Sequence, residues 1–174
     1  MEHQHWDWKK MMPKTTVLLG EYPLTIDPKG RILVPAEVRR ALDPERDGTA
    51  FVVSIGINGQ PWFYPERGYE ALVSSLTSQL SPGEDRLAFD QLYFSMASRE
   101  EWDSQGRMMI PLQARRSVEL GKDVSLIGVR DHLELWNQEA WEIRKKYLIA
   151  QRAELANKQR EAEERMIAVK KATG

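Results

Sequence analysis

The sequence predicts an α+β protein built from two tandem copies of one β-rich unit, followed by a long C-terminal helix. The first observation is a motif, Asp-x-x-Gly-Arg-x-x-hydrophobic-Pro, at 27–35 and again at 103–111. The second is that an Arg-Arg pair follows each motif at the same distance, so equivalent residues are displaced by 76 positions (27 to 103, 39 to 115). The third is that short apolar runs alternate with turn residues around both motifs, as expected of repeated β-rich units.

The residue pattern of the first copy predicts its elements in order. A β-rich run precedes the motif, and a proline after it favours the start of a short helix. Two further apolar runs flank Asn58-Gly59, a dipeptide typical of hairpin turns. Two helices then follow, separated by a Ser-Pro-Gly break. The predicted elements are a β-rich run at 15–26, a strand at 32–34, a helix at 35–42, strands at 51–55 and 62–64, and helices through 69–76 and 87–96.

The second copy repeats this order, with a strand around Trp102, a helix through Arg115 and strands at 124–129 and 133–136. Downstream of the motifs the displacement falls to 72, so the first copy carries four extra residues in the loop at 43–49. Each half therefore has the order β-β-α-β-β-α. Because such short strand pairs cannot cover their own apolar faces, we expect the halves to interlock into one barrel.

These patterns divide the chain into five parts. The N-terminal leader has no periodicity and is expected to be disordered outside the core, whereas the other parts carry the elements above. The parts are a leader at 1–14, a first repeat at 15–80, a connecting helix at 81–97, a second repeat at 98–143 and a C-terminal helical extension at 144–174.

The final helix is expected to run from about 137 to 171, because neither Gly nor Pro interrupts it. Its apolar residues form a single row rather than the two rows of a coiled-coil seam. One interpretation is a solvated helix supported by the pairs Glu154–Lys158 and Glu161–Arg165. The other is that the apolar row packs on a neighbouring subunit.

Composition narrows the function classes. The 174-residue chain has a formal net charge of −1, which argues against indiscriminate coating of nucleic acid. It contains no cysteine, which excludes disulfides, thiolate catalysis and cysteine-based zinc sites. No segment reads as a signal peptide or a membrane span, so we expect a soluble cytoplasmic protein. Any DNA binding must therefore be local, where positive residues gather around the motifs.

The repeated motif suits anion recognition. Gly30 and Gly106 allow a sharp reversal of the chain, and the preceding acids, Asp27 and Asp103, can accept hydrogen bonds from the loop or hold the following arginine. The arginines, Arg31 and Arg107, present planar donors that match phosphate oxygens or a guanine edge. Taken singly, each motif could be a plain turn. Its repetition, with Arg in the same place, favours a two-site binder.

The motifs resemble those of the MraZ family, the double-domain members of the AbrB-like transcription regulators. The resemblance also includes Leu-Gly-Glu-Tyr at 19–22 and Trp-Asn-Gln-Glu-Ala-Trp at 136–141. It implies tandem AbrB-like units in a swapped-hairpin barrel and ring-like homo-oligomers associated with the nucleoid. It also implies binding to double-stranded DNA carrying short repeated promoter elements of a division and cell-wall gene cluster.

The resemblance also implies roles for individual residues. The loop arginines that contact DNA correspond to Arg31 and Arg107, and their supporting residues to Asp27, Gly30, Asp103 and Gly106. The arginine pairs used for DNA in the wider group correspond to Arg39, Arg40, Arg115 and Arg116. Lys29 adds a positive charge to the first loop, where the second has Gln105, so the first loop should bind phosphate more strongly. The leader and the helix beyond Trp141 depart from a compact family member.

The sequence disfavours an enzyme and leaves one other function class open. An enzyme is not expected, because His132 has no nucleophile near it in sequence and the chain has no phosphate-binding glycine loop. No cofactor or metal is expected, since the acidic and histidine residues at 2–7 lie in the leader, where a metal site lacks a held geometry. The remaining alternative is an antitoxin-like or other protein-interaction module that holds a partner through its C-terminal helix.

Overall fold

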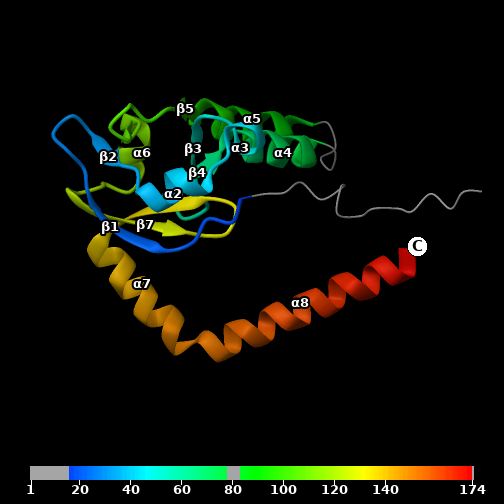
Figure 1. The fold of residues 1–174 in the computed structure, drawn as a ribbon. Helices are drawn as coiled ribbons and strands as arrows, with labels where there is room; N and C mark the ends of the chain where they lie inside the picture. The colour runs from blue at the N-terminus through cyan, green and yellow to red at the C-terminus, as the bar shows by residue number, and fades with distance from the viewer. Residues whose placement is uncertain (1–15, 78–82, 174) are drawn as a thin grey trace, which may run out of the picture. The chain divides into compact units, whose positions relative to one another are not determined.

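The computed structural model describes residues 16–77 and 83–173 (Figure 1). The predicted leader at 1–14 lies outside the described residues. The chain divides into a body up to Gln138 and a helical unit from Glu139 onward. Both α-helices and antiparallel strands are present in the body, so the α+β fold class is confirmed.

An antiparallel six-stranded sheet forms the larger part of the body. Its strand order is β1-β7-β8-β4-β3-β5. The predicted hairpin at Asn58-Gly59 joins β3 to β4, and Gly59 adopts a φ of 85° in this turn. The strands are β1 (Glu21–Thr25), β3 (Phe51–Ile55), β4 (Pro61–Pro65), β5 (Ser98–Glu100), β7 (Asp123–Gly128) and β8 (Leu133–Asn137).

The two repeats exchange strands within this sheet. β1 of the first repeat pairs with β7 of the second, and β5 of the second repeat pairs with β3 of the first. The central pair, β4 and β8, joins the two halves. Since β1, β3 and β4 are equivalent to β5, β7 and β8, the strand order reads the same from either end of the sheet. The fold therefore has an internal pseudo-twofold arrangement.

A separate two-stranded ribbon pairs β2 (Arg31–Leu33) with β6 (Arg107–Met109). Its central residues, Ile32 and Met108, face each other and are buried. In the described residues the six-stranded sheet stays open and the ribbon stays separate, so the strand ladders do not join into the closed barrel expected from the sequence. Each motif contains its own ribbon strand, β2 or β6, whereas the strands before and after the motif belong to the six-stranded sheet. No continuous ladder of the described strands therefore joins the ribbon to the sheet.

The short helices after the motifs follow the predicted spacing. α2 (Ala36–Ala41) and α6 (Leu112–Ser117) are displaced by the same 76 positions as the motifs. Pro35 and Pro111 lie at the N-cap, and their fixed φ leads into the helix. α2 therefore begins one residue later than the predicted start at 35. The extra residues of the first copy contain another short helix, α3 (Pro44–Asp47). The longer helices α4 (Glu66–Thr77) and α5 (Glu84–Ser95) follow, and α5 occupies the region predicted as a connecting helix.

One hydrophobic core lies between the ribbon, the sheet and the short helices. Val38 of α2 and Ala114 of α6 are buried in it at equivalent positions of the two repeats. Because both repeats contribute to every layer of this core, neither half has a core of its own. The other buried core residues are Leu18, Ile32, Val34, Phe51, Val53, Phe63, Met108, Ile110, Val124, Leu126, Leu133 and Leu135.

The C-terminal unit contains α7 (Gln138–Ala150) and α8 (Arg152–Thr173). The prediction of one uninterrupted helix is wrong, because the helix is interrupted at Gln151. Neither Gly nor Pro lies there, and nothing in the described contacts explains the interruption. The two predicted ion pairs are present, with Glu154 Oε1 2.5 Å from Lys158 Nζ and Glu161 Oε2 3.6 Å from Arg165 Nη2.

Candidate nucleic-acid interface

The first motif folds into a tight loop that is closed by its own aspartate. Asp27 Oδ1 accepts hydrogen bonds from the backbone N–H groups of Lys29 and Arg31, both at 2.9 Å. The Gly30 N–H donates to the Asp27 carbonyl at 2.8 Å, and Gly30 adopts a φ of 81°. Such a positive φ favours glycine, which explains why the motif needs it there.

The second motif repeats this geometry atom by atom. Asp103 Oδ1 accepts from the backbone N–H groups of Gln105 at 2.9 Å and Arg107 at 3.0 Å. Gly106 donates to the Asp103 carbonyl at 2.8 Å and has a φ of 80°. The sequence repeat is therefore also a repeat of backbone conformation.

Each aspartate also holds the arginine of its own loop. Arg31 Nε and Nη2 lie 2.8 and 2.7 Å from Asp27 Oδ2, and Arg107 Nε and Nη2 lie 2.9 and 2.8 Å from Asp103 Oδ2. One edge of each guanidinium is thus occupied. Among the described residues the far edge, with Nη1, has no protein partner. Its N–H groups are available to an external acceptor, and the aspartate fixes where they point.

These contacts shift the acidity of both aspartates. Hydrogen bonds from the side chain and backbone of Arg31 lower the pKa of Asp27 below its ordinary value. Hydrogen bonds from the backbone and side chain of Arg107 lower the pKa of Asp103 to about 2. Both carboxylates are therefore ionised at neutral pH and remain hydrogen-bond acceptors for their arginines.

The register of the ribbon places both arginines on one face. Arg31 pairs with Met109, and Leu33 pairs with Arg107. Since side chains alternate along a strand, these four residues point away from the buried pair at the centre of the ribbon. The side chains of Arg31 and Arg107 are 23% and 36% exposed, and they flank the exposed Leu33 and Met109.

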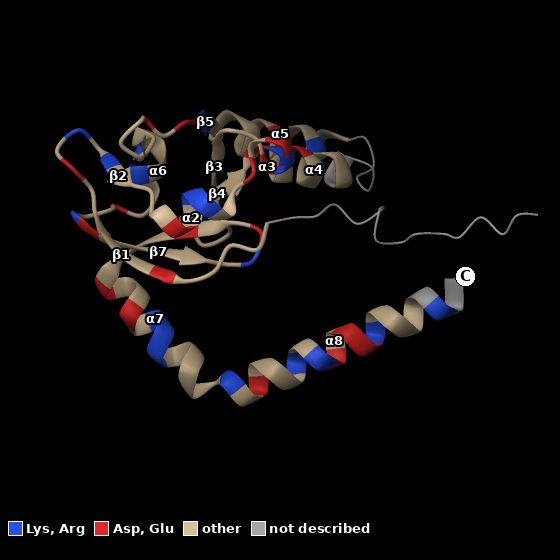
Figure 2. Ribbon diagram, viewed as in Figure 1, with Lys and Arg blue, Asp and Glu red and all other residues tan. Residues whose placement is uncertain are grey.

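The Arg-Arg pairs split as the helical spacing predicts, with one member of each pair facing outward. Arg40 of α2 and Arg116 of α6 are exposed, whereas Arg39 and Arg115 are half-buried. Lys29 is exposed at the tip of the first loop. Lys and Arg residues mark the β1–β2 loop, β2, α2 and α6 in Figure 2. The positive residues named from the sequence thus gather around the ribbon and its two loops.

Comparison with known proteins identifies the family. A family model described as "MraZ protein, putative antitoxin-like" matches the chain twice, over residues 17–90 and 93–167. The chain belongs to the MraZ family. The two MraZ matches correspond to the two repeats found in the sequence, so the family resemblance and the duplication are confirmed. The second match runs past Trp141, through α7 and into α8.

Curated MraZ proteins cover most of the chain. The chain is 37% identical over 125 residues to the Transcriptional regulator MraZ of Heliobacterium modesticaldum, which covers 72% of this chain and 84% of that protein. It is 37% identical over 142 residues to the Transcriptional regulator MraZ of Pelotomaculum thermopropionicum, covering 82% and 94%. Both relatives are named as transcriptional regulators.

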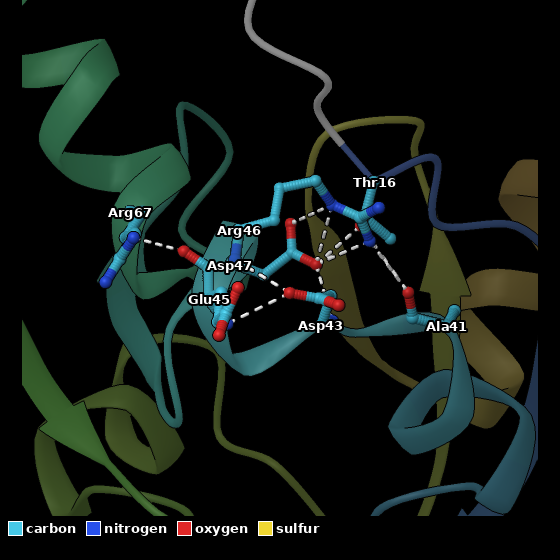
Figure 3. Close-up of polar contacts among 7 residues, drawn as sticks. All are labelled: Thr16, Ala41, Asp43, Glu45, Arg46, Asp47 and Arg67. Atoms are coloured by element: carbon cyan, nitrogen blue, oxygen red, sulfur yellow. Dashed lines mark hydrogen bonds and ion pairs between the residues drawn. The ribbon is translucent and has the colours of Figure 1, made fainter.

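A polar cluster surrounds α3, which the first MraZ repeat has and the second lacks (Figure 3). Asp47, only 4% exposed, accepts hydrogen bonds from Thr16 Oγ1 at 2.6 Å and from the Asp43 N–H at 2.8 Å. Arg46 Nη2 lies 2.8 Å from Asp47 Oδ2 and also donates to Thr16 Oγ1 and to the Ala41 carbonyl. This cluster ties the start of the described chain to the insertion. The spacing of the two repeats predicts the length of the insertion but does not indicate this pairing.

His132 is buried between two aromatic rings. Its ring centroid lies 4.5 Å from that of Trp62 and 4.8 Å from that of Tyr64. Nδ1 lies 2.9 Å from Asp131 Oδ1, and Nε2 lies 3.5 Å from Glu134 Oε1. Burial opposes a charge on this ring, but hydrogen bonds with Glu134 and Asp131 outweigh that effect and raise the pKa of His132.

Neither a metal site nor a membrane segment is found in residues 16–77 and 83–173. No three His, Cys, Asp or Glu residues of these ranges gather into a group that could hold a metal ion. None of their helices is both long enough and apolar enough to cross a membrane. The acidic and histidine residues at 2–7 lie outside the described part of the chain.

Proposed function

We propose that this chain is a sequence-specific, DNA-binding transcriptional regulator whose two Asp-x-x-Gly-Arg loops contact the DNA. The observation that carries the proposal is that Arg31 and Arg107 share one face of the β2–β6 ribbon, each aimed by its own aspartate. The major groove of DNA admits a two-stranded ribbon. Guanidinium groups at both ends of such a ribbon can then reach phosphates or guanine edges.

The surrounding positive residues extend this contact. Arg40, Arg116 and Lys29 are exposed around the ribbon and are assigned to the phosphate backbone, which carries most of the salt-dependent affinity. The net charge of −1 makes such a local patch necessary, because the chain as a whole does not attract DNA. In this proposal the six-stranded sheet and the ribbon together take the place of the swapped-hairpin barrel that the AbrB-like resemblance implies.

Oligomerisation would multiply the number of loops that face the DNA. We infer a ring-like homo-oligomer, associated with the nucleoid in the cytoplasm, that binds several copies of a short element in the promoter of a division and cell-wall gene cluster. Linking weak contacts in one particle raises their effective concentration, so affinity should rise steeply with the number of elements. Native mass measurement gives the subunit number on which this inference depends.

The proposal is tested by binding to DNA from the region upstream of the protein's own gene, in duplexes with one, two and three copies of the candidate element. The double variant Arg31→Ala/Arg107→Ala should lose the specific complex, and the slope of log affinity against log salt should fall by about 1 for each phosphate contact removed. The double variant Arg152→Ala/Arg160→Ala on α8 removes the same two charges from exposed sites and serves as the control. Wild-type affinity in the double variant, or equal affinity for one and three copies, would contradict the proposal.

A second candidate function is a protein-interaction module. It is favoured by the antitoxin-like description of the family model and by exposed apolar residues on the C-terminal unit, among them Ile143, Tyr147 and Leu155. Truncation after Leu148 separates the two candidates. Loss of a co-purifying protein with DNA binding intact supports the module, whereas loss of neither leaves DNA binding as the function of the chain.

A further inference from the structure

The side chain of Arg39 contacts the opposite repeat. It lies on α2 of the first repeat, but its guanidinium packs against Gly106, in the loop of the second repeat. A Cβ atom built on Gly106 would lie only 2.8 Å from Arg39 Cζ and 2.8 Å from its Nε. The backbones are joined at the same place, since the Val34 N–H donates to the Gly106 carbonyl at 2.8 Å. Arg39 Nε in turn donates to the Val34 carbonyl at 3.1 Å.

Arg115 makes the equivalent contact, from the second repeat to the first. It lies on α6 of the second repeat, and its guanidinium packs against Gly30 in the loop of the first. A Cβ atom built on Gly30 would lie 2.8 Å from Arg115 Cζ. The Ile110 N–H donates to the Gly30 carbonyl at 2.9 Å, as Val34 does to Gly106. The contact is therefore present twice and follows the pseudo-twofold arrangement of the fold.

We propose that Arg39 and Arg115 are positioning residues, each of which packs its guanidinium against the glycine of the opposite repeat's loop and thereby holds that loop's DNA-contacting arginine in place. Arg39 positions Arg107, and Arg115 positions Arg31. This inference rests on the proposed DNA-binding function for its consequence, but the contacts themselves do not depend on DNA. It assigns these two arginines a different role from that of their exposed neighbours Arg40 and Arg116.

The chemistry of the site requires arginine in this position. A guanidinium is flat and weakly hydrated, so it can lie half-buried against a peptide plane. A lysine ammonium is compact and strongly hydrated, and it would leave the space over the glycine partly unfilled. A side chain on the glycine would occupy the same space and would also need an unfavourable positive φ. Glycine and the crossing arginine therefore depend on each other.

The first test uses the free protein, without DNA. Amide hydrogen exchange is followed at Gly106 and Arg107 in one loop and at Gly30 and Arg31 in the other. Arg39→Ala should speed exchange about tenfold in the loop at 103–107 and leave the loop at 27–31 unchanged. Arg115→Ala should show the mirror image. Equal changes in both loops, or none in either, would overturn the proposal.

Two matched variants keep this test decisive. Arg40→Ala removes the same side chain from the next position of α2 and should leave exchange in both loops unchanged. Arg39→Lys keeps the charge and most of the side-chain stem, so it addresses the case in which Arg39→Ala does not fold. The lysine variant should still speed exchange in the loop at 103–107 alone. Wild-type exchange in the lysine variant would show that charge, rather than the flat guanidinium, holds the loop, and would overturn the proposal.

The second test is a double-mutant cycle with DNA. If Arg39 acts through Arg107, Arg39→Ala should weaken binding in the wild type and in the Arg31→Ala background by the same factor. In the Arg107→Ala background, Arg39→Ala should cause little further loss of DNA affinity. Additive losses in both backgrounds would show that Arg39 contacts DNA itself. If the wild-type protein fails to bind the duplexes at all, the proposed function fails, and the exchange measurement still decides the positioning role.

Discussion

Arg31 and Arg107 lie at opposite ends of the same face of the β2–β6 ribbon, although 76 positions separate them in the sequence. The pairings Arg31 with Met109 and Leu33 with Arg107 fix this relationship. The two guanidinium groups therefore move with one ribbon rather than with two independent loops. A change in the register of the ribbon by one residue would turn both of them toward the core.

The aspartates of the loops give a prediction in which two effects have opposite signs. Removing a negative charge beside DNA should strengthen binding through electrostatics, but removing Asp27 or Asp103 also frees the arginine that it aims. We expect orientation to dominate, so that Asp27→Ala/Asp103→Ala weakens DNA binding by roughly tenfold. Fluorescence anisotropy with a labelled duplex measures the affinity. Glu37→Ala, which removes an exposed acid near Arg40, is the control and should bind more tightly.

The loop glycines give a stability prediction. Gly30→Ala and Gly106→Ala each place a methyl group against an arginine guanidinium and force a non-glycine residue to a positive φ. Each should lower the free energy of unfolding by about 1–3 kcal/mol. Gly68→Ala in α4 meets only ordinary contacts and should instead stabilise the protein by up to about 1 kcal/mol. Urea denaturation compares the three variants, and a common sign for all three would contradict the prediction.

The buried carboxylate of the insertion gives a third prediction. Asp47→Ala removes the acceptor for Thr16 and leaves Arg46 without its ion-pair partner. We expect a loss of about 2 kcal/mol in the free energy of unfolding, as for other buried hydrogen-bonded groups left unpaired. Glu45→Ala, an exposed acid of the same short helix, should change stability by less than about 0.5 kcal/mol. Equal effects of the two variants in thermal unfolding would contradict a stabilising role for the polar cluster around Asp47.

His132 predicts a dependence of stability on pH. Its pKa is raised in the folded protein, because hydrogen bonds with Glu134 and Asp131 outweigh the effect of burial. Its contribution is therefore fully present below its ordinary pKa of 6.5 and is lost as the pH rises through the higher folded value. Unfolding free energies measured between about pH 6 and about pH 9 should fall more in the wild type than in His132→Gln. A parallel decline in both proteins would exclude this role for the histidine.

Much of the local structure follows from the sequence, because local patterns determine it. The motif spacing predicts α2 and α6, and the smaller displacement of 72 predicts the match of β4 with β8. The extra residues at 43–49 are also visible in the sequence, although the helix α3 within them is not. These features depend on residues that are close together in the chain. The two copies of the repeat can therefore be compared residue by residue.

The long-range features could not be predicted in the same way. The exchange of β1 and β5 between repeats depends on pairings that join distant strands, and both outcomes satisfy the same alternation of apolar residues. The contact of Arg39 with Gly106 likewise joins residues of different repeats, and no pattern in either repeat marks it. The spacing did indicate that one arginine of each pair faces outward, but it could not indicate what the inner arginine touches.

The strand exchange has a consequence for assembly. Separate polypeptides covering residues 16–77 and 83–173 would leave β1 and β5 each without the neighbour that completes its edge of the sheet. Two such fragments would have to find each other in solution, and their folding would vary with concentration. Joining them in one polypeptide makes the encounter intramolecular. The body can therefore form in a single molecule at any dilution.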